Sequence, residues 1–315
     1  MIHKSILELI GNTPMVRLNR VTSGLTSTVL AKLEYLNPSG SLKDRIALEM
    51  IEQAEKNGEL RPGYTIVDAS TGNTGIALAL VSVLKGYRVV IYQALSGDVS
   101  TERTKIMRNL GADVKVVVTD REFADKSVPG AEIELPARKA CLDSERENHD
   151  VWWARQFSNS ANVEAHKKTG EEILSQTHGN IDVFVASIGT GGTLMGIAEV
   201  LKKEREDIVI VGVQPASSLE CIQPGGSYPR SNIKGGIVSD MLEKNLVDEV
   251  ITVSDEEAVA MTHRLWREEG LLAGISSGAN VLAAIKKGQL IKGKTLVTIL
   301  PDSMNRYLTE EHYVT

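Results

Sequence analysis

Short apolar runs alternate with longer amphipathic stretches along most of this 315-residue chain. The apolar runs are rich in β-branched residues, which favours buried strands, and they lie at 28–34, 65–68, 88–92, 113–118, 183–187, 209–213 and 295–300. The stretches with helical spacing lie at 46–54, 75–85, 102–110, 194–203, 255–269 and 279–287. Strands that alternate with helices predict βαβ units, in which helices cover both faces of a parallel sheet.

The length of the chain predicts one or two domains, and the pattern of strands and helices favours two such α/β modules. A polar, irregular stretch at 143–150 is a candidate boundary between them. The stretch 215–236 is rich in Ser, Gly and Pro and predicts a long loop, of the kind that often carries function. Ser254 followed by three acidic residues predicts the start of a helix.

Composition narrows the functional class. Hydrophobic residues make up 42% and charged residues 24% of the chain, as in ordinary globular proteins. A formal net charge of -6 argues against a nucleic-acid-binding protein. Only two cysteines occur, Cys141 and Cys221, which predicts a reducing, cytoplasmic setting rather than a disulfide framework. We find no histidine pair at metal-ligand spacing, no apolar signal region at the N-terminus and no apolar run of about 18 residues.

The segment 37–45 places Lys43 between a Pro/Ser/Gly turn and the expected helix at 46–54. The positive end of a helix dipole disfavours a charged amine, and burial would disfavour it further. A neutral lysine is a nucleophile and a base, and it can form a Schiff base with an aldehyde cofactor. The alternative is a solvated surface lysine, with Ser39 and Ser41 serving only to cap the helix.

Three further loops each lead into a predicted helix. Gly189–Thr193 follows a strand and offers backbone N–H groups and two hydroxyls, which suits a phosphate, although a tight turn is an equal alternative. Ser70–Gly75 is dense in hydroxyls, glycines and an amide, which suits a carboxylate; helix capping would explain one of these residues. Gly274–Ala279 offers a serine for a ring nitrogen, and alone it favours a simple helix cap.

Together these segments resemble the fold type II pyridoxal-phosphate enzymes, in particular the cysteine synthase (O-acetylserine sulfhydrylase) and cystathionine β-synthase family. The resemblance runs through nearly the whole chain. It is carried by 10–14, 37–45, 70–75, 156–159, 189–193, 274–279, 300–302 and 306–308.

The resemblance implies roles for particular residues. Lys43 would hold pyridoxal 5'-phosphate as a Schiff base and act as the catalytic residue. The other cofactor-binding residues would be Asn73, Gly189, Thr190, Gly191, Gly192, Thr193 and Ser276. The residues that bind the substrate would be Ser70, Thr71, Gly72, Asn73, Thr74, Gln156 and Gly235. The implied fold is α/β, with two three-layer α/β/α domains of tryptophan synthase β-like architecture.

The larger, cofactor-binding domain would comprise residues 1–36 and 152–315, and residues 37–151 would form a smaller, mobile domain. The resemblance also implies a homodimer that acts on small amino-acid substrates. The implied reaction is a β-replacement on an O-activated L-serine, with O-acetyl-L-serine and sulfide giving L-cysteine and acetate. Lys43 would take the proton from Cα of the substrate.

Several segments depart from the usual pattern of that family. The loop at 70–74 reads Ser-Thr-Gly-Asn-Thr, where Thr-Ser-Gly-Asn-Thr is usual, and 300–303 is more like the cystathionine β-synthases. Gly235 begins Gly-Gly-Ile-Val, followed by Ser239 and Asp240, in place of Gly-Ile-Gly-Ala. Synthesis of cystathionine, lanthionine or a diaminopropionate from serine, cysteine or O-phosphoserine therefore stays open. Arg230, in the long loop, could favour a phosphorylated donor, but an ordinary surface arginine is the preferred interpretation. A catalytically silent phosphate-binding protein is a further alternative.

Overall fold

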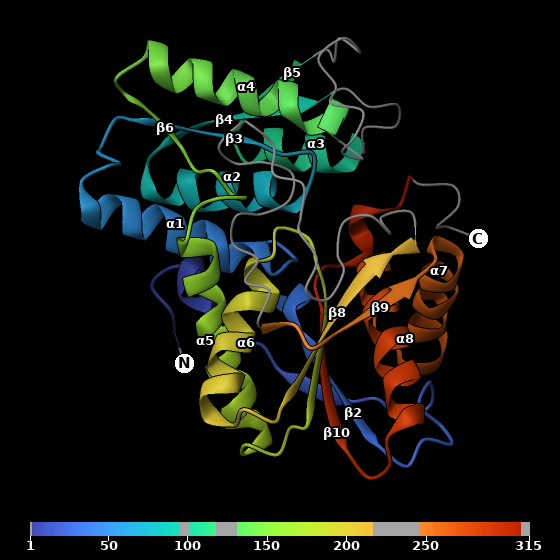
Figure 1. Ribbon diagram of the computed structural model, residues 1–315. Coiled ribbons are helices and arrows are strands. Elements are labelled where there is room, and N and C mark those ends of the chain that lie inside the picture. The colour runs from blue at the N-terminus through green and yellow to red at the C-terminus, as the bar shows by residue number, and fades with distance from the viewer. Residues whose placement is uncertain (1, 95–100, 118–130, 217–245, 310–315) are drawn as a thin grey trace. The chain divides into compact units, whose positions relative to one another are not determined.

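The computed structural model describes residues 2–94, 101–117, 131–216 and 246–309, and the chain divides into two compact units (Figure 1). Within these residues, the first unit comprises 2–42, 163–216 and 246–305, and the second comprises 43–94, 101–117, 131–162 and 306–309. The chain passes from the first unit to the second between Leu42 and Lys43, and back between Asn162 and Val163. The domain limits expected at 36/37 and 151/152, and the mobility of the smaller domain, stay predictions.

The described part of the first unit contains one six-stranded sheet. Its order is β1 (Met15–Arg17), β2 (Thr28–Leu33), β10 (Thr295–Leu300), β7 (Val183–Ser187), β8 (Val209–Pro215) and β9 (Glu249–Val253). β1 runs antiparallel to β2, and every other neighbouring pair is parallel.

Alternate residues of these strands enter two hydrophobic cores, because successive side chains of a strand point to opposite faces. Val183 and Val185 of β7 pack in one core, and Phe184 and Ala186 pack in the other. The first core is closed by α7 (Asp255–Arg264) and α8 (Ile275–Leu290), and the second by α5 (Ala161–Thr177) and α6 (Gly192–Glu204). The first unit is therefore a three-layer α/β/α body.

The second unit has a parallel sheet, in the order β5 (Asp113–Val117), β4 (Arg88–Ala94), β3 (Thr65–Ala69) and β6 (Val151–Trp153). α4 (Ala131–Glu147) packs on one face, where Ala137 and Cys141 contact Val67 and Trp153. α2 (Asn73–Lys85) packs on the other face against β4, and α1 (Lys43–Asn57) and α3 (Thr101–Asn109) pack beside α2. The α/β fold with two three-layer bodies is thus confirmed.

The candidate boundary at 143–150 was wrong. Residues 143–147 form the last turn of α4, whose outer face is polar because it meets water, and the whole stretch lies within the second unit. The expected helix at 255–269 has two parts, since α7 ends at Arg264 and a π-helix, Leu265–Glu269, follows. Of the long loop expected at 215–236, Pro215 is the last residue of β8, and residues from 217 onward lie outside the described part.

The predicted start of α7 is confirmed by a capping box. The Ser254 hydroxyl accepts a hydrogen bond from the backbone N–H of Glu257, and the Glu257 carboxylate accepts one from the N–H of Ser254. The first turn of α7 thus satisfies two of its own backbone donors. α2, α6 and α8 begin differently, because the residue at each N-cap position is a glycine.

We expect Gly278→Ala to destabilise the first unit by about 3 kcal/mol or more, because the site is already filled. A Cβ at Gly278 in α8 would lie 2.2 Å from both the carbonyl oxygen of Ala258 and the hydroxyl oxygen of Thr262 in α7. Gly288→Ala in the same helix is the control, since the nearest atom to its Cβ would be 3.5 Å away. Urea unfolding should show a large loss for the first variant and a neutral or stabilising change for the second. Equal effects would contradict the packing described here.

Candidate active site

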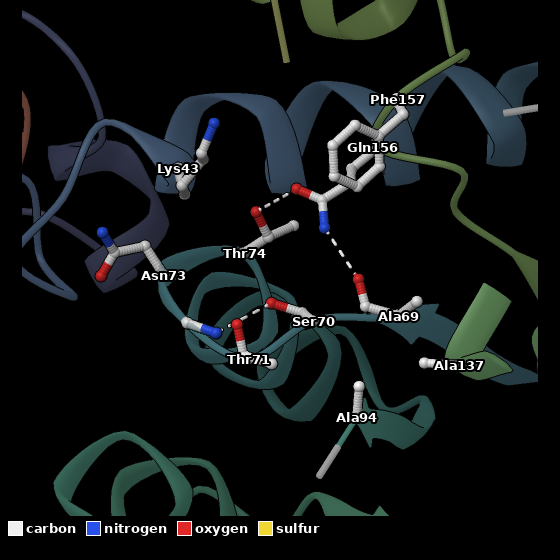
Figure 2. A pocket seen from close by; sticks show the side chains of 11 residues that line it. Lys43, Ala69, Ser70, Thr71, Asn73, Thr74, Ala94, Ala137, Gln156 and Phe157 are labelled. Atoms are coloured by element: carbon white, nitrogen blue, oxygen red, sulfur yellow. Dashed lines mark hydrogen bonds between the residues drawn. The ribbon is translucent and has the colours of Figure 1, made fainter. Parts of the chain in front are cut away.

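A pocket in the second unit brings together most of the residues expected to bind the substrate. Lys43 from the start of α1 and Gln156 from the segment after β6 line it, together with the whole loop between β3 and α2. Figure 2 shows the pocket, whose lining residues are Lys43, Ala69, Ser70, Thr71, Gly72, Asn73, Thr74, Ala94, Ala137, Gln156 and Phe157. Because β3, β4 and β6 are parallel, this loop, Ala94 and the segment after Trp153 meet at the carboxyl edge of the sheet, where ligands of open α/β sheets bind.

Gln156 fixes one wall of the pocket through both ends of its amide. Its side-chain N–H donates to the carbonyl oxygen of Ala69 at 2.8 Å, and its oxygen accepts from the Thr74 hydroxyl at 2.6 Å (Figure 2). Gln156 is 6% exposed and Thr74 is 3% exposed, so these bonds are shielded from water. The backbone carbonyl of Gln156 accepts from the Asn162 side chain at 2.8 Å. The amide is therefore held in one orientation beside the loop.

Ser70 has the helix-capping role that the sequence offered as an alternative to substrate binding. Its hydroxyl accepts hydrogen bonds from the backbone N–H groups of Gly72 at 3.2 Å and Gly75 at 3.0 Å, so it serves the first turn of α2. Gly72 is at the N-cap position and has no side chain to offer. Thr71 is exposed and Asn73 is half-buried, and both line the pocket. Capping thus accounts for Ser70, whereas the Thr74 hydroxyl bonds to Gln156 instead.

Lys43 is the first residue of α1, as the sequence predicted, and its side chain is half-buried at the pocket. The residue before it is anchored in the first unit, since the N–H of Leu42 donates to the carbonyl oxygen of Pro301 at 2.9 Å and Ser41 pairs with Asp302. Lys43 thus stands at the N-terminal, positive end of the α1 dipole.

Behind the pocket lies a buried polar cluster that sequence reasoning missed. Asp68, at 1% exposure, accepts a hydrogen bond from the indole N–H of Trp153 at 2.9 Å. Burial raises the pKa of Asp68 to about 7. The hydrogen bonds from Trp153 and from backbone N–H groups and the positive charge of Arg138 lower this pKa, but burial outweighs them. Arg138 is itself 1% exposed, and its guanidinium lies 3.6 Å from the ring centre of Phe157, which lines the pocket. The one feature of the sequence that could have indicated this cluster is the position of Asp68, two residues before Ser70.

The loop Gly189–Thr193 joins β7 to α6 in the first unit. Gly191 has a φ of +88°, which favours glycine, and it occupies the N-cap position of α6. Because Gly191 has no side chain, none at the N-cap accepts a hydrogen bond from the first backbone N–H groups of α6. The space beside Gly189 is open, since a Cβ there would meet nothing within 4 Å. Backbone donors, two threonine hydroxyls and a helix N-terminus together form a donor set that fits a phosphate.

Ser276 lies in the first turn of α8 and is half-buried. The chain before it is paired to the segment after β10, through the Ala273–Ser303 bridge and the hydrogen bond from the N–H of Gly274 to the carbonyl oxygen of Asp302. Because β10 and β7 are parallel neighbours, the Ser276 turn and the loop Gly189–Thr193 belong to the same edge of the sheet. The adjacent Ser277, which the sequence did not single out, has a buried hydroxyl without a hydrogen-bond partner among the described residues.

The remaining candidate residues cannot be placed. Gly235, expected to face the substrate, lies outside the described residues, as do Arg230, Asp240 and Cys221. Cys141 is buried against the sheet of the second unit, and burial raises the pKa of its thiol, as expected for a structural cysteine. No helix in the described part of the chain is long and apolar enough to cross a membrane.

Comparison with known proteins decides the family. The family model described as "Pyridoxal-phosphate dependent enzyme" matches residues 6–302. The chain belongs to this family of pyridoxal-phosphate-dependent enzymes. Within the family it is 42% identical over 314 residues to a cysteine synthase of Staphylococcus aureus, covering 98% of this chain and 96% of that protein.

Solved structures of the family have the same fold. The cysteine synthase of Entamoeba histolytica has a TM-score of 0.86 and 34% identity, over 100% of this chain and 92% of that one. A hydrogen sulfide-producing enzyme of Fusobacterium nucleatum has a TM-score of 0.84 and 33% identity, over 98% of both chains. The chain is therefore a pyridoxal-phosphate-dependent enzyme, as predicted. A lysine amine, a phosphate donor set and a neutral hydroxyl are groups that suit this cofactor.

Proposed function

We propose that this chain is a cysteine synthase, which replaces the acetoxy group of O-acetyl-L-serine with sulfide to give L-cysteine and acetate. The observation that carries the proposal is the pocket in which Lys43, the loop Ser70–Thr74 and Gln156 occur together. The 42% identity to the cysteine synthase of Staphylococcus aureus supports the same reaction.

In this proposal Lys43 would hold pyridoxal 5'-phosphate through its amine, and Asn73 and Ser276 would bind the pyridine ring. Gly189, Thr190, Gly191, Gly192 and Thr193 would bind the phosphate. The bound cofactor supplies an electron sink that makes the Cα proton of an amino acid acidic. The resemblance to the family described above supports this assignment.

The residues of the pocket would bind and orient the amino-acid substrate. The N–H groups and hydroxyls at Ser70, Thr71, Gly72, Asn73 and Thr74, with Gln156, would receive its α-carboxylate, and Gly235 would face its side chain. The hydrogen bonds from Thr74 and to Ala69 hold Gln156 in place before the substrate arrives, which lowers the entropy cost of binding. The amine of Lys43 would then take the proton from Cα and transfer it in the reverse direction later.

A second candidate is a β-replacement with other partners, as in cystathionine, lanthionine or diaminopropionate synthesis. The loop order Ser-Thr at 70–71 and Asp302 after β10 favour it, since both depart from the usual cysteine synthase pattern. The relative from Fusobacterium nucleatum is described as hydrogen sulfide-producing, which is a different outcome on the same fold. The donor would then be serine, cysteine or O-phosphoserine, and the acceptor a thiol or an amine.

A matrix of donors and acceptors tests the proposal. Purified protein, loaded with pyridoxal 5'-phosphate, is mixed with each of O-acetylserine, serine, cysteine and O-phosphoserine, together with sulfide, homocysteine, cysteine or an amine. Products are identified by mass, and kcat/KM is compared between pairs. We expect O-acetylserine with sulfide to give the highest value. A different pair with a kcat/KM higher by tenfold or more would replace the proposed substrates. The absence of turnover with every pair would favour a catalytically silent binding protein.

We also propose a homodimer in the cytoplasm. The family resemblance supports the dimer, and the scarcity of cysteine supports a reducing compartment. Sedimentation of the purified protein at several concentrations tests the dimer, since a monomer at all of them would contradict it.

A further inference from the structure

A buried histidine lies directly behind the loop proposed to bind the phosphate. His166 in α5 is 0% exposed, and its Nε2 lies 3.1 Å from the hydroxyl oxygen of Thr193, in the first turn of α6. Its Nδ1 lies 3.2 Å from the hydroxyl oxygen of Thr169, which is also 0% exposed. Each ring nitrogen therefore faces a threonine hydroxyl, and one of these hydroxyls belongs to the loop.

Close packing of α5 on α6 fixes the ring in this place, and the two helices lie side by side in Figure 1. A Cβ on Gly196 of α6 would lie 2.3 Å from the carbonyl oxygen of Val163 and 2.9 Å from Cβ of His166. Gly196 follows Thr193 by three residues, so both occupy the face of α6 that meets α5. One turn further along, a Cβ on Gly170 of α5 would lie 2.9 Å from Val200 of α6.

The proton on His166 decides what Thr193 can do. A hydroxyl has one hydrogen to donate, and the oxygens of a phosphate dianion only accept. If Nε2 has no proton, Thr193 donates its hydrogen to the ring and presents only lone pairs to an anion. If Nε2 carries the proton, the ring donates to the Thr193 oxygen, and the hydroxyl hydrogen can point at the phosphate. In a neutral ring Nδ1 then accepts the hydrogen of Thr169.

We propose that His166 is a positioning residue for the cofactor phosphate: it carries a proton on Nε2 and thereby directs the Thr193 hydroxyl hydrogen toward the phosphate. The inference rests on the proposed function, since it takes Gly189–Thr193 as the phosphate loop. His166 does not touch the cofactor in this arrangement and acts through Thr193. The consequence is that the strength of cofactor binding depends on a side chain from the neighbouring helix.

The tautomer of His166 is measured first, on the unmodified enzyme. Nitrogen NMR of 15N-histidine-labelled protein, with and without pyridoxal 5'-phosphate, shows which ring nitrogen is protonated. We expect Nε2 to carry the proton in the loaded enzyme. An Nδ1–H tautomer in the loaded enzyme would overturn the proposal, and this readout needs no substitution that could disturb folding.

Variants then test the consequence for binding. His166→Gln keeps an N–H donor at nearly the reach of Nε2, whereas His166→Asn places its amide closer to Thr169 and cannot reach Thr193. When pyridoxal 5'-phosphate is titrated into the apoenzyme, we expect His166→Asn to raise its dissociation constant by about tenfold or more. This is the effect of losing one hydrogen bond to a charged group. His166→Gln should stay within a few fold of the unmodified enzyme and keep the phosphorus NMR shift of the bound cofactor.

Thr193→Val separates this inference from the proposed function. If Thr193→Val weakens cofactor binding and His166→Asn adds no further loss in the double variant, the two residues act as a unit and the inference holds. If Thr193→Val weakens binding and His166→Asn alone does not, the inference fails and the phosphate loop stands. Unchanged binding in Thr193→Val would overturn the inference, because the Thr193 hydroxyl would then not bind the phosphate, while the backbone donors of the loop would remain. Matching circular dichroism and unfolding midpoints of the apoenzymes exclude a loss of fold.

Discussion

Lys43→Ala is expected to lower kcat/KM by at least about 10³-fold, because the residue would both hold the cofactor and move the Cα proton. The same variant should lose the visible absorbance of lysine-bound cofactor while keeping the unfolding midpoint of the apoprotein. Lys43 is the first residue of α1, and its side chain is half-buried. Steady-state kinetics and absorbance spectra of the purified variant provide the measurement.

Two comparisons make this result specific. Lys56→Ala removes an exposed lysine from the last turn of the same helix, and it should leave both the spectrum and kcat/KM unchanged. Addition of a small primary amine to Lys43→Ala should restore part of the turnover, since the amine replaces the missing proton carrier. Lys43→Ala with normal turnover would remove the lysine from the proposed reaction.

Asp68 is expected to make the second unit less stable as the pH rises from about 4 to about 7. Burial raises its pKa from 3.8 to about 7 in the folded protein, so the folded state binds a proton that the unfolded state has already released. The contribution is complete below the unfolded pKa and is lost as the pH passes the folded one. The full difference is on the order of 4 kcal/mol. Urea unfolding between pH 4.5 and 8, followed by tryptophan fluorescence, measures it.

Asp68→Asn is the matched variant for this prediction. The amide keeps an oxygen for the indole N–H of Trp153 but has no proton to gain or lose in this range. The fall in the urea midpoint with pH should therefore be much smaller in Asp68→Asn than in the unmodified protein. Identical pH profiles for the two proteins would mean that Asp68 does not titrate near neutrality.

The alternation of apolar runs and amphipathic stretches predicted the central strands well. Most residues of β3, β4, β7, β8 and β10 are buried, so each strand contains a run of apolar residues that is easily recognised. The elements that the sequence did not reveal are polar or short. α4 contains Pro136 and α5 contains Gly170, two residues that usually argue against a helix interior. β6 has only three residues, and its pairing with β3 depends on the rest of the sheet.

The candidate site also has parts that a local sequence pattern predicts and parts that it does not. Loops dense in Gly, Ser, Thr and Asn pointed to Lys43 and to the loops proposed to bind the phosphate and the substrate, because these residue types are rarely needed together for structure alone. The hydrogen bond from Thr74 to Gln156 joins residues 82 positions apart, and no local pattern could predict it. The cluster of Asp68, Arg138 and Trp153 could not be predicted for the same reason, because its members are far apart in the sequence. Buried polar side chains from three elements look like surface residues until the fold places them together.

The glycine at the N-cap of α6 has a consequence for the folding of the enzyme. α7 completes its own first turn with Ser254 and Glu257, whereas α6 begins at a residue that has no side chain. Under the proposed role of the loop, the phosphate acts as the missing cap, so a diffusible molecule supplies the last piece of a secondary structure. Cofactor that binds there would add its binding free energy to the stability of the folded enzyme, so the loaded enzyme should unfold at a higher temperature than the apoenzyme.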